Sequence, residues 1–150
     1  MWIVPDLNPD GVAAGTRQNA HRVDLNRNFP FHWPLLAPPG SLYYPGPRPL
    51  SEPESRLAAR LILLIRPVLA IWYHQALNLV DDSQGPRAAE RRYASLTGMR
   101  EAPLTDYPGS AVGWEDATIG PTAFVVELPA GPLSPADVRR HVAAVHALLR

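Results

Sequence analysis

The sequence contains no cysteine, no lysine and no apolar run long enough to cross a membrane. Without cysteine there is no disulfide framework, and cysteine usage leaves the redox compartment undetermined. The 14 basic residues, all of them arginine, balance 14 acidic residues, so charge gives no argument for binding nucleic acid or an anionic membrane. The N-terminus has neither a basic region nor a small-residue cleavage site, and we therefore expect the chain to stay in the cytoplasm.

A chain of 150 residues is long enough for one domain with its own core, and we expect residues 1–150 to form a single domain. Short apolar runs predict strands, and apolar residues with helical spacing predict helices. The predicted strands are Trp2 to Pro5, Val68 to Tyr73, a short one near Arg100, and Thr122 to Leu128; the predicted helices begin after Ser51, at Arg87 and after Ser134. This order predicts an α/β sandwich around a largely parallel sheet.

The stretch from Asp6 to Leu50 has little periodicity and is rich in proline, glycine and asparagine. Loops of this length are uncommon in compact domains and are usually functional or disordered; two adjacent tyrosines indicate that this one packs. Within it, NPDG (Asn8 to Gly11) is typical of a type I turn. Directly after it, Ser51 and Glu54 have the spacing of a helix capping box.

His74 follows one predicted buried strand, and Glu127 lies near the end of another. In open α/β sheets, ligands bind beyond the carboxyl ends of the strands. If the two strands are parallel, both side chains lie at the same edge of the sheet and form a candidate site. The alternative for each residue is structural: a partly buried, hydrogen-bonded histidine and a solvated charge at a strand end.

The loop sequence RQNAHRVDLNRNFP (Arg17 to Pro30) is rich in charged and amide side chains. Arg27 offers the planar fork that binds carboxylates through two parallel hydrogen bonds. Asn26 adds an amide donor, and Arg17 is a second cation on the same loop. The loop is therefore a candidate anion site. The alternative is that Asp24 pairs with Arg27 and that the asparagines only shape turns.

Six motifs occur in a fixed order: LNPDG, VDLNRNFP, YPGPRPLSEPE, HQ after a strand, PGS followed by a tryptophan, and VVELP. With this order and rough spacing, the chain resembles the M14 zinc carboxypeptidase family over nearly its whole length. Within the family it resembles the bacterial murein peptide amidase branch, which cleaves the γ-D-glutamyl–diaminopimelate bond of peptidoglycan peptides. The resemblance implies a three-layer α/β/α sandwich with a mixed, largely parallel sheet. It also implies one catalytic zinc and a peptide or muropeptide substrate with a free carboxylate.

The resemblance assigns roles to individual residues. His74 matches the zinc ligand that follows the family's His-x-x-Glu pair, and Glu127 matches the general base that takes a proton from the zinc-bound water. Arg17 matches the arginine that stabilises the oxyanion of the tetrahedral intermediate. Asn26 and Arg27 match the pair that binds the terminal carboxylate of the substrate.

The resemblance also points to residues around this site. Tyr107 matches a mobile catalytic tyrosine of the family, although it lies closer to the following Gly-Ser pair than is usual there. The alternatives are that Tyr107 fills this role from a shifted position and that the role is vacant. Substrate specificity in the family is set near Ala111 and Val112, and their lack of charge argues against a pocket for a basic side chain. Gln75, next to His74, matches a residue that is expected to orient the zinc ligand.

No His-x-x-Glu occurs in these 150 residues, whereas a catalytic zinc site uses three protein ligands. We therefore expect the chain to be the C-terminal part of an M14 domain, without its N-terminal strands, and neither to bind zinc tightly nor to hydrolyse peptides. We treat the His-x-x-Asp formed by His21 and Asp24 as accidental. The alternatives to an enzyme are a catalytically inactive module that binds carboxylate-bearing peptides and a gene remnant without function.

Overall fold

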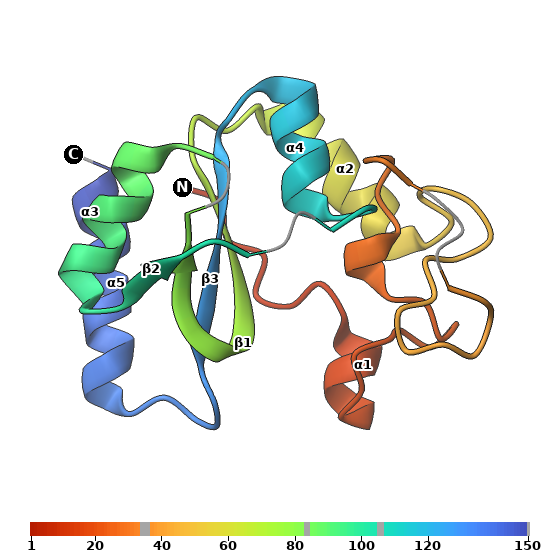
Figure 1. The fold of residues 1–150 in the computed structure, drawn as a ribbon, viewed down its shortest axis with the longest axis horizontal. Coiled ribbons are helices and arrows are strands. Elements are labelled where there is room, and N and C mark those ends of the chain that lie inside the picture. The colour runs from red at the N-terminus through yellow and green to blue at the C-terminus, as the bar shows by residue number, and fades with distance from the viewer. Residues whose placement is uncertain (34–36, 83–84, 105–106, 150) are drawn as a thin grey trace. The chain divides into compact units, whose positions relative to one another are not determined.

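The computed structural model describes residues 1–33, 37–82, 85–104 and 107–149. The chain divides into two compact units, of which unit 1 comprises Met1–Arg66 with Asp106–Ile119 and unit 2 comprises Pro67–Thr105 with Gly120–Arg150. Figure 1 labels the helices and strands of both units. Within the described residues, every helix falls short of the length and apolarity that a membrane span requires.

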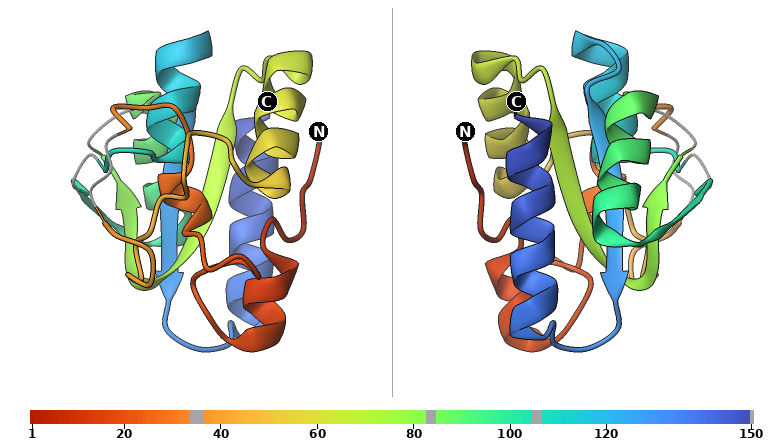
Figure 2. Two further views of the ribbon diagram at one scale, coloured as in Figure 1. Left: turned by 90° about the vertical axis from the view of Figure 1, so that its right-hand side faces the viewer. Right: turned by 90° about the vertical axis from the view of Figure 1, so that its left-hand side faces the viewer.

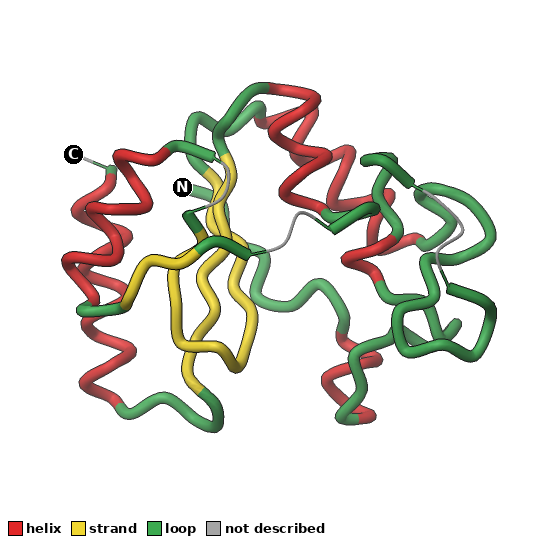
Figure 3. The backbone as a smooth tube through the Cα atoms, viewed as in Figure 1, coloured by secondary structure: helices red, strands yellow, loops and turns green. Residues whose placement is uncertain are grey.

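Unit 2 is built on a three-stranded sheet in the order β2-β1-β3, in which both strand pairs are parallel. Figure 3 draws these strands in yellow. The strands are β1 (Ala70–Asp81), β2 (Arg100–Ala102) and β3 (Ala123–Pro129). The first half of β1 pairs in register with β3, so that His74 faces Glu127. After register shifts near Leu77, Leu79 pairs both with Glu127 and with Arg100 of β2. The predicted parallel sheet of an α/β fold is confirmed.

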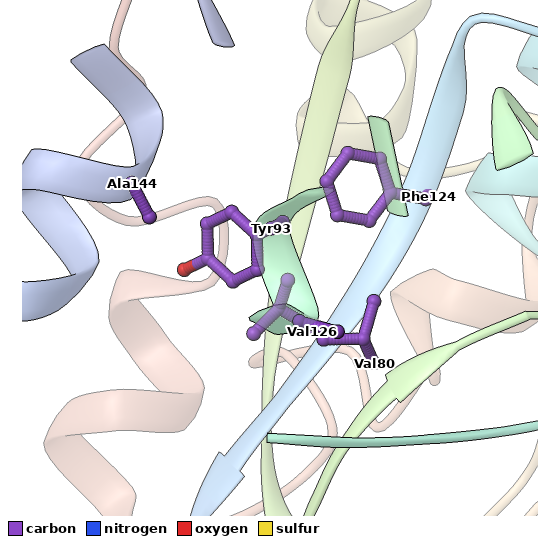
Figure 4. Close-up of a cluster of buried hydrophobic side chains, with 6 residues drawn as sticks. Val80, Tyr93, Phe124, Val126 and Ala144 are labelled. Carbon is purple, nitrogen blue, oxygen red and sulfur yellow. The ribbon is translucent and has the colours of Figure 1, made fainter. Parts of the chain in front are cut away.

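Two helices, α3 (Arg87–Thr97) and α5 (Pro135–Leu148), lie next to each other against this sheet (Figures 1 and 2). Tyr93 of α3 and Ala144 of α5 pack on Val80, Phe124 and Val126 of the strands (Figure 4). Phe124 and Val126 point to the same face of β3 because side chains alternate along a strand. Burying each large apolar side chain of such a core contributes about 1.5–3 kcal/mol, so this cluster holds the helices to the sheet.

A chain of hydroxyl and imidazole hydrogen bonds crosses the same core. The hydroxyl of Tyr93, which is fully buried, lies 3.0 Å from the hydroxyl of Tyr73 in β1 and 2.7 Å from Nδ1 of His141 in α5. Burial, followed by the neighbouring Tyr73 hydroxyl, raises the pKa of Tyr93, so this group stays protonated at neutral pH. The three polar groups join a strand and both helices without leaving the Tyr93 hydroxyl unsatisfied.

Unit 1 contains short helices and long loops: α1 (Pro9–Ala14), the 3-10 turn η1 (Leu25–Arg27), α2 (Pro53–Ile65) and α4 (Ala111–Ile119). Its loops are held by Asn28, which is fully buried. The Asn28 amide donates to the carbonyls of Pro45 and Arg48 and to Ser51 Oγ, and its Oδ1 accepts from Ser55 Oγ and from the N–H of Glu52. One side chain therefore contacts five polar groups and holds the residues at which α2 begins.

Several sequence predictions for these elements are wrong. Trp2 to Pro5 form no strand, and none of the described strands pairs with them. NPDG, predicted as a type I turn, instead begins a helix: Oδ1 of Asn8 accepts a hydrogen bond from the N–H of Gly11 at 3.0 Å and caps α1. The N-cap of α2 is Glu52, without a side-chain capping bond, because Ser51 is engaged by Asn28 and Glu52.

Other predictions are confirmed. The helix predicted from Arg87 ends at Thr97, with Gly98 in a left-handed conformation. Ser134 caps α5, since its Oγ accepts from the N–H of Asp137 at 3.2 Å. β1, however, does not stop at Tyr73. It continues to Asp81 because its second half pairs with β2 and again with β3, so His74 lies inside the strand and not after it.

Candidate functional site

The loop from Arg17 to Pro30, called the arginine loop below, belongs to unit 1 and brings both predicted arginines to one tyrosine. The guanidinium carbon of Arg17 lies 5.2 Å from the centroid of the Tyr43 ring, and that of Arg27 lies 5.7 Å from the same centroid. Arg27 also lies 4.4 Å from the ring centroid of Tyr107. These distances fall within the range of cation–π attraction, so two cations and two aromatic rings form one cluster.

Asp24 is the anionic member of this cluster, and it pairs with Arg17. Its Oδ2 lies 2.6 Å from Arg17 Nε, and its side chain is only 2% exposed. The alternative in which Asp24 pairs with Arg27 is therefore wrong. The other Asp24 oxygen accepts from the backbone N–H of Asn26 at 3.1 Å and caps η1. Asp24 thus sets the position of Arg17 and the conformation of the Asn26–Arg27 pair.

Arg27 is partly withdrawn from water and lies in a positive environment. Burial, together with repulsion from Arg17, lowers its pKa from the ordinary value of arginine, although Asp24 acts in the opposite direction. An arginine stays charged after any such shift. Its Nη1 donates to the Asn26 carbonyl at 2.6 Å. Because Asp24 is already bound to Arg17, the site has one positive charge in excess, which favours an anionic ligand.

The amide of Asn26 is oriented by the start of α4. Its Oδ1 accepts a hydrogen bond from the backbone N–H of Ala111 at 2.9 Å. With the oxygen engaged in this way, the Nδ2 group is the part of the amide that remains to donate to a ligand. The Ala111 side chain itself is 1% exposed, so Ala111 acts on this site through its backbone.

Tyr107 and α4 are joined to the arginine loop through Gly109. The N–H of Phe29 donates to the Gly109 carbonyl at 3.0 Å, and the N–H of Gly109 donates to the Phe31 carbonyl at 2.6 Å. Gly109 has φ +77°, and a Cβ at this position would overlap the carbonyl oxygen of Arg27. Only glycine allows the two segments to approach this closely, and this approach places Tyr107 beside Arg27.

His74 and Glu127 form a separate pair in unit 2. They are partners in the register of β1 and β3, and both are half-buried. Partners on neighbouring parallel strands point to the same face of a sheet, so the predicted pairing of these two residues agrees with the register. Gln75, on the opposite face, donates through Nε2 to the carbonyls of Pro129 at 2.7 Å and Gly131 at 2.8 Å.

The described residues do not fit a zinc site. They include no group of three or more histidine, cysteine, aspartate or glutamate side chains that could hold a metal ion, whereas a catalytic zinc takes three protein ligands. The His-x-x-Asp of His21 and Asp24 does not provide one, since His21 Nδ1 lies 2.6 Å from Glu52 Oε2 while Asp24 binds Arg17. We therefore derive no catalytic step through a metal.

The predicted site residues divide between the two units. Arg17, Asn26, Arg27, Tyr107 and Ala111 belong to unit 1, and His74 and Glu127 belong to unit 2. Sequence reasoning missed Tyr43 as a member of the arginine cluster. The signal for it was the pair of tyrosines in an otherwise Pro- and Gly-rich loop, which indicates packing but not the packing partner.

Comparison with known proteins gives the family. The model of the M14 peptidase family, zinc carboxypeptidase, matches residues 1–82. The chain belongs to this family. It is 32% identical over 128 residues to murein peptide amidase A of Escherichia coli K12, an alignment that covers 75% of this chain and 51% of that protein. It is also 32% identical over 167 residues to murein peptide amidase A of Vibrio campbellii, covering 99% of this chain and 64% of that protein.

Solved structures agree with this assignment. The murein-tripeptide amidase of E. coli O157 matches with a TM-score of 0.76 and 28% identity, covering 95% of this M14 chain and 65% of that chain. The carboxypeptidase A of Helicoverpa armigera matches with a TM-score of 0.79 and 20% identity, covering 99% and 50%, which supports the fold alone. The chain spans about half the length of the E. coli curated relative.

Proposed function

We propose that this M14 chain binds the free carboxylate of a peptide or muropeptide in unit 1 and that Arg17, Asn26 and Arg27 donate the hydrogen bonds. The observation that carries the proposal is the arrangement around Arg27: a second guanidinium lies on the same tyrosine, while Asp24 is bound to Arg17. A carboxylate would supply the missing negative charge and would accept from the Arg27 fork.

The donors left for such a ligand follow from the bonds already made. Arg17 uses Nε for Asp24, and Arg27 uses Nη1 for the Asn26 carbonyl. Within the described residues, Arg17 Nη1 and Nη2, Arg27 Nε and Nη2, and Asn26 Nδ2 remain. Charge-assisted hydrogen bonds of this kind contribute about 1.5–3 kcal/mol each, enough to distinguish a peptide acid from its amide.

The wider family reaction is a further proposal: hydrolysis of a peptide or γ-D-glutamyl amide bond next to that carboxylate. The relatives named murein peptide amidase favour a muropeptide over an ordinary peptide. The roles of Glu127 as general base, His74 as zinc ligand, Arg17 as the arginine that stabilises the oxyanion and Tyr107 as the family's mobile catalytic tyrosine stay predictions. The single domain and the cytoplasmic location also stay predictions. Because the described residues do not complete a zinc site, we propose that the 150-residue chain by itself only binds.

Calorimetric titration in the presence of a chelator tests the binding proposal. An N-acetylated dipeptide acid should bind, its C-terminal amide should bind more weakly, and Arg27→Ala should lose at least about tenfold in affinity for the acid. Arg60→Ala, which removes an exposed positive charge from α2 of the same unit, should bind like wild type. Equal affinities of Arg27→Ala and wild type would contradict the proposal.

A zinc-dependent enzyme is the second candidate, and the chelator distinguishes it from a binding module. Peptide binding that disappears in chelator and returns with zinc would favour the enzyme. Turnover then decides between the two reactions of the family. Release of diaminopimelate-containing peptide from a murein tripeptide would indicate the amidase, whereas release of ordinary C-terminal residues would indicate a carboxypeptidase.

A further inference from the structure

Tyr43 occupies the centre of the arginine cluster, a position that the family comparison does not assign. Its ring centroid is 5.2 Å from the guanidinium carbon of Arg17 and 5.7 Å from that of Arg27. These two arginines come from positions ten residues apart in the sequence. The ring is therefore the contact that both arginines share.

The segment that carries Tyr43 is fixed to the arginine loop at both ends. The N–H of Asp24 donates to the carbonyl of Tyr44 at 2.8 Å. Before Tyr43, the side chain of Gln18 donates to the Ser41 carbonyl at 2.8 Å, and Ser41 Oγ accepts from the N–H of Tyr43 at 3.3 Å. Because these bonds hold the backbone, the ring stays beside the arginines although Tyr43 is 51% exposed.

Two guanidinium groups in one cluster repel each other, and long side chains lose rotamer freedom when a ligand fixes them. Asp24 offsets the charge of Arg17 at 2.6 Å. The negative face of an aromatic ring attracts both cations. A ring held by the backbone therefore places the two arginines before the ligand arrives, which lowers the entropic cost of binding.

We propose that Tyr43 is a positioning residue of the carboxylate site, whose ring holds Arg17 and Arg27 ready for the ligand. This inference rests on the proposed function and adds to it a residue that need not contact the carboxylate. The part that acts is the aromatic face, so phenylalanine should replace tyrosine, whereas leucine should not.

The test combines a measurement without ligand and one with ligand. In ¹⁵N NMR spectra of the free chain, Tyr43→Leu should shift the Nε–H resonances of Arg17 and Arg27, because the ring current is lost. In titrations with the N-acetylated dipeptide acid, Tyr43→Leu should bind about fivefold to thirtyfold more weakly. Tyr43→Phe should bind within about twofold of wild type on the same grounds.

Leu42→Ala is the matched control, because Leu42 is the exposed neighbour of Tyr43 on the same segment. It should change neither the two arginine resonances nor the affinity. The proposed role of Tyr43 is wrong if Tyr43→Leu leaves the two arginine resonances in place. It is also wrong if Tyr43→Leu binds the acid like wild type while Arg27→Ala binds it more weakly. In either case the proposed carboxylate site stands. If wild type fails to bind the acid, the proposed function is wrong, and the role of Tyr43 in binding is overturned with it.

Discussion

Replacing Gly109 with alanine is expected to damage both the stability of unit 1 and its carboxylate site. Gly109 has φ +77°, and a non-glycine residue in this left-handed region costs about 1–2 kcal/mol. The added Cβ would also overlap the Arg27 carbonyl oxygen and lie 2.8 Å from the Arg27 Cα. Overpacking of this kind costs about 1–3 kcal/mol, so the total is about 2–5 kcal/mol.

The added Cβ would clash with the backbone of Arg27. Displacement of this backbone should also displace the Arg27 side chain that forms the binding site. Relief requires the Tyr107–Ala111 segment to separate from the arginine loop, which would break the hydrogen bonds of Gly109 with Phe29 and Phe31. Asn26 would lose the orientation that Ala111 imposes. We therefore expect Gly109→Ala to melt at a lower temperature and to bind the dipeptide acid at least about tenfold more weakly.

Gly15→Ala separates the cost of the left-handed backbone conformation from the cost of the steric clash. Gly15 has φ +64° and belongs to the same unit, but a Cβ there would meet no atom within 4 Å. It should therefore show only the backbone cost, about 1–2 kcal/mol, with binding unchanged. Thermal melting and titration of both variants make the comparison. Equal melting temperatures together with wild-type affinity for Gly109→Ala would refute the argument from close approach.

Three further predictions concern pH, the core and zinc. Glu52 raises the pKa of His21 above its ordinary 6.5. Burial opposes the ionisation of Glu52, but the hydrogen bonds that Glu52 accepts from Ser51, Asn19 and His21 outweigh burial. They lower the pKa of Glu52 below the ordinary 4.5. The pair therefore stabilises the fold fully between about pH 4.5 and 6.5. The melting temperatures of His21→Asn and wild type should differ most in this range and converge at higher pH. A difference in melting temperature that stays constant with pH would contradict this. Tyr93→Phe removes the hydroxyl bonded to Tyr73 and His141 and should lower the free energy of unfolding by about 1–3 kcal/mol in urea melts, whereas an unchanged midpoint would show that the network adds nothing. The purified chain should hold less than stoichiometric zinc by metal analysis, because a catalytic zinc takes three protein ligands and the described residues include no group of three that could hold a metal. Stoichiometric zinc with peptidase turnover would refute this.

The elements of unit 2 were predictable because their signals are local. The apolar run of β3 and the Ser134 cap of α5 identify their elements directly. The end of β1 was not predictable in this way. Its second half is a strand because β2 and β3 pair with it, and pairing partners distant in sequence leave no local signal.

In unit 1, the missed elements have specific physical causes. α4 has buried residues at five successive positions, Ala111 to Glu115, so it lacks the apolar stripe by which a surface helix is identified. The capping-box pattern of Ser51 and Glu54 failed because Asn28, more than twenty residues earlier, binds Ser51 instead. Side chains that hold loops together from a distance override the local pattern.

The arginine site was predictable as a set of residues but not as a geometry. The family resemblance selects Arg17, Asn26 and Arg27 from the sequence. It does not tell which arginine Asp24 binds, how the Asn26 amide is turned, or that Tyr43 lies between the arginines. Each of these depends on contacts between loops, which only the fold provides.

The most direct test of the carboxylate site is a double-mutant cycle in which one change is made in the ligand and one in the protein. All measurements are made in the presence of a chelator. The affinities of wild type and Arg27→Ala are measured for the N-acetylated dipeptide acid and for its C-terminal amide. If Arg27 binds the carboxylate, the substitution weakens the acid far more than the amide, with a coupling energy of about 1.5–3 kcal/mol. If Arg27→Ala weakens both ligands equally, Arg27 does not bind the carboxylate, and the account of this site is wrong.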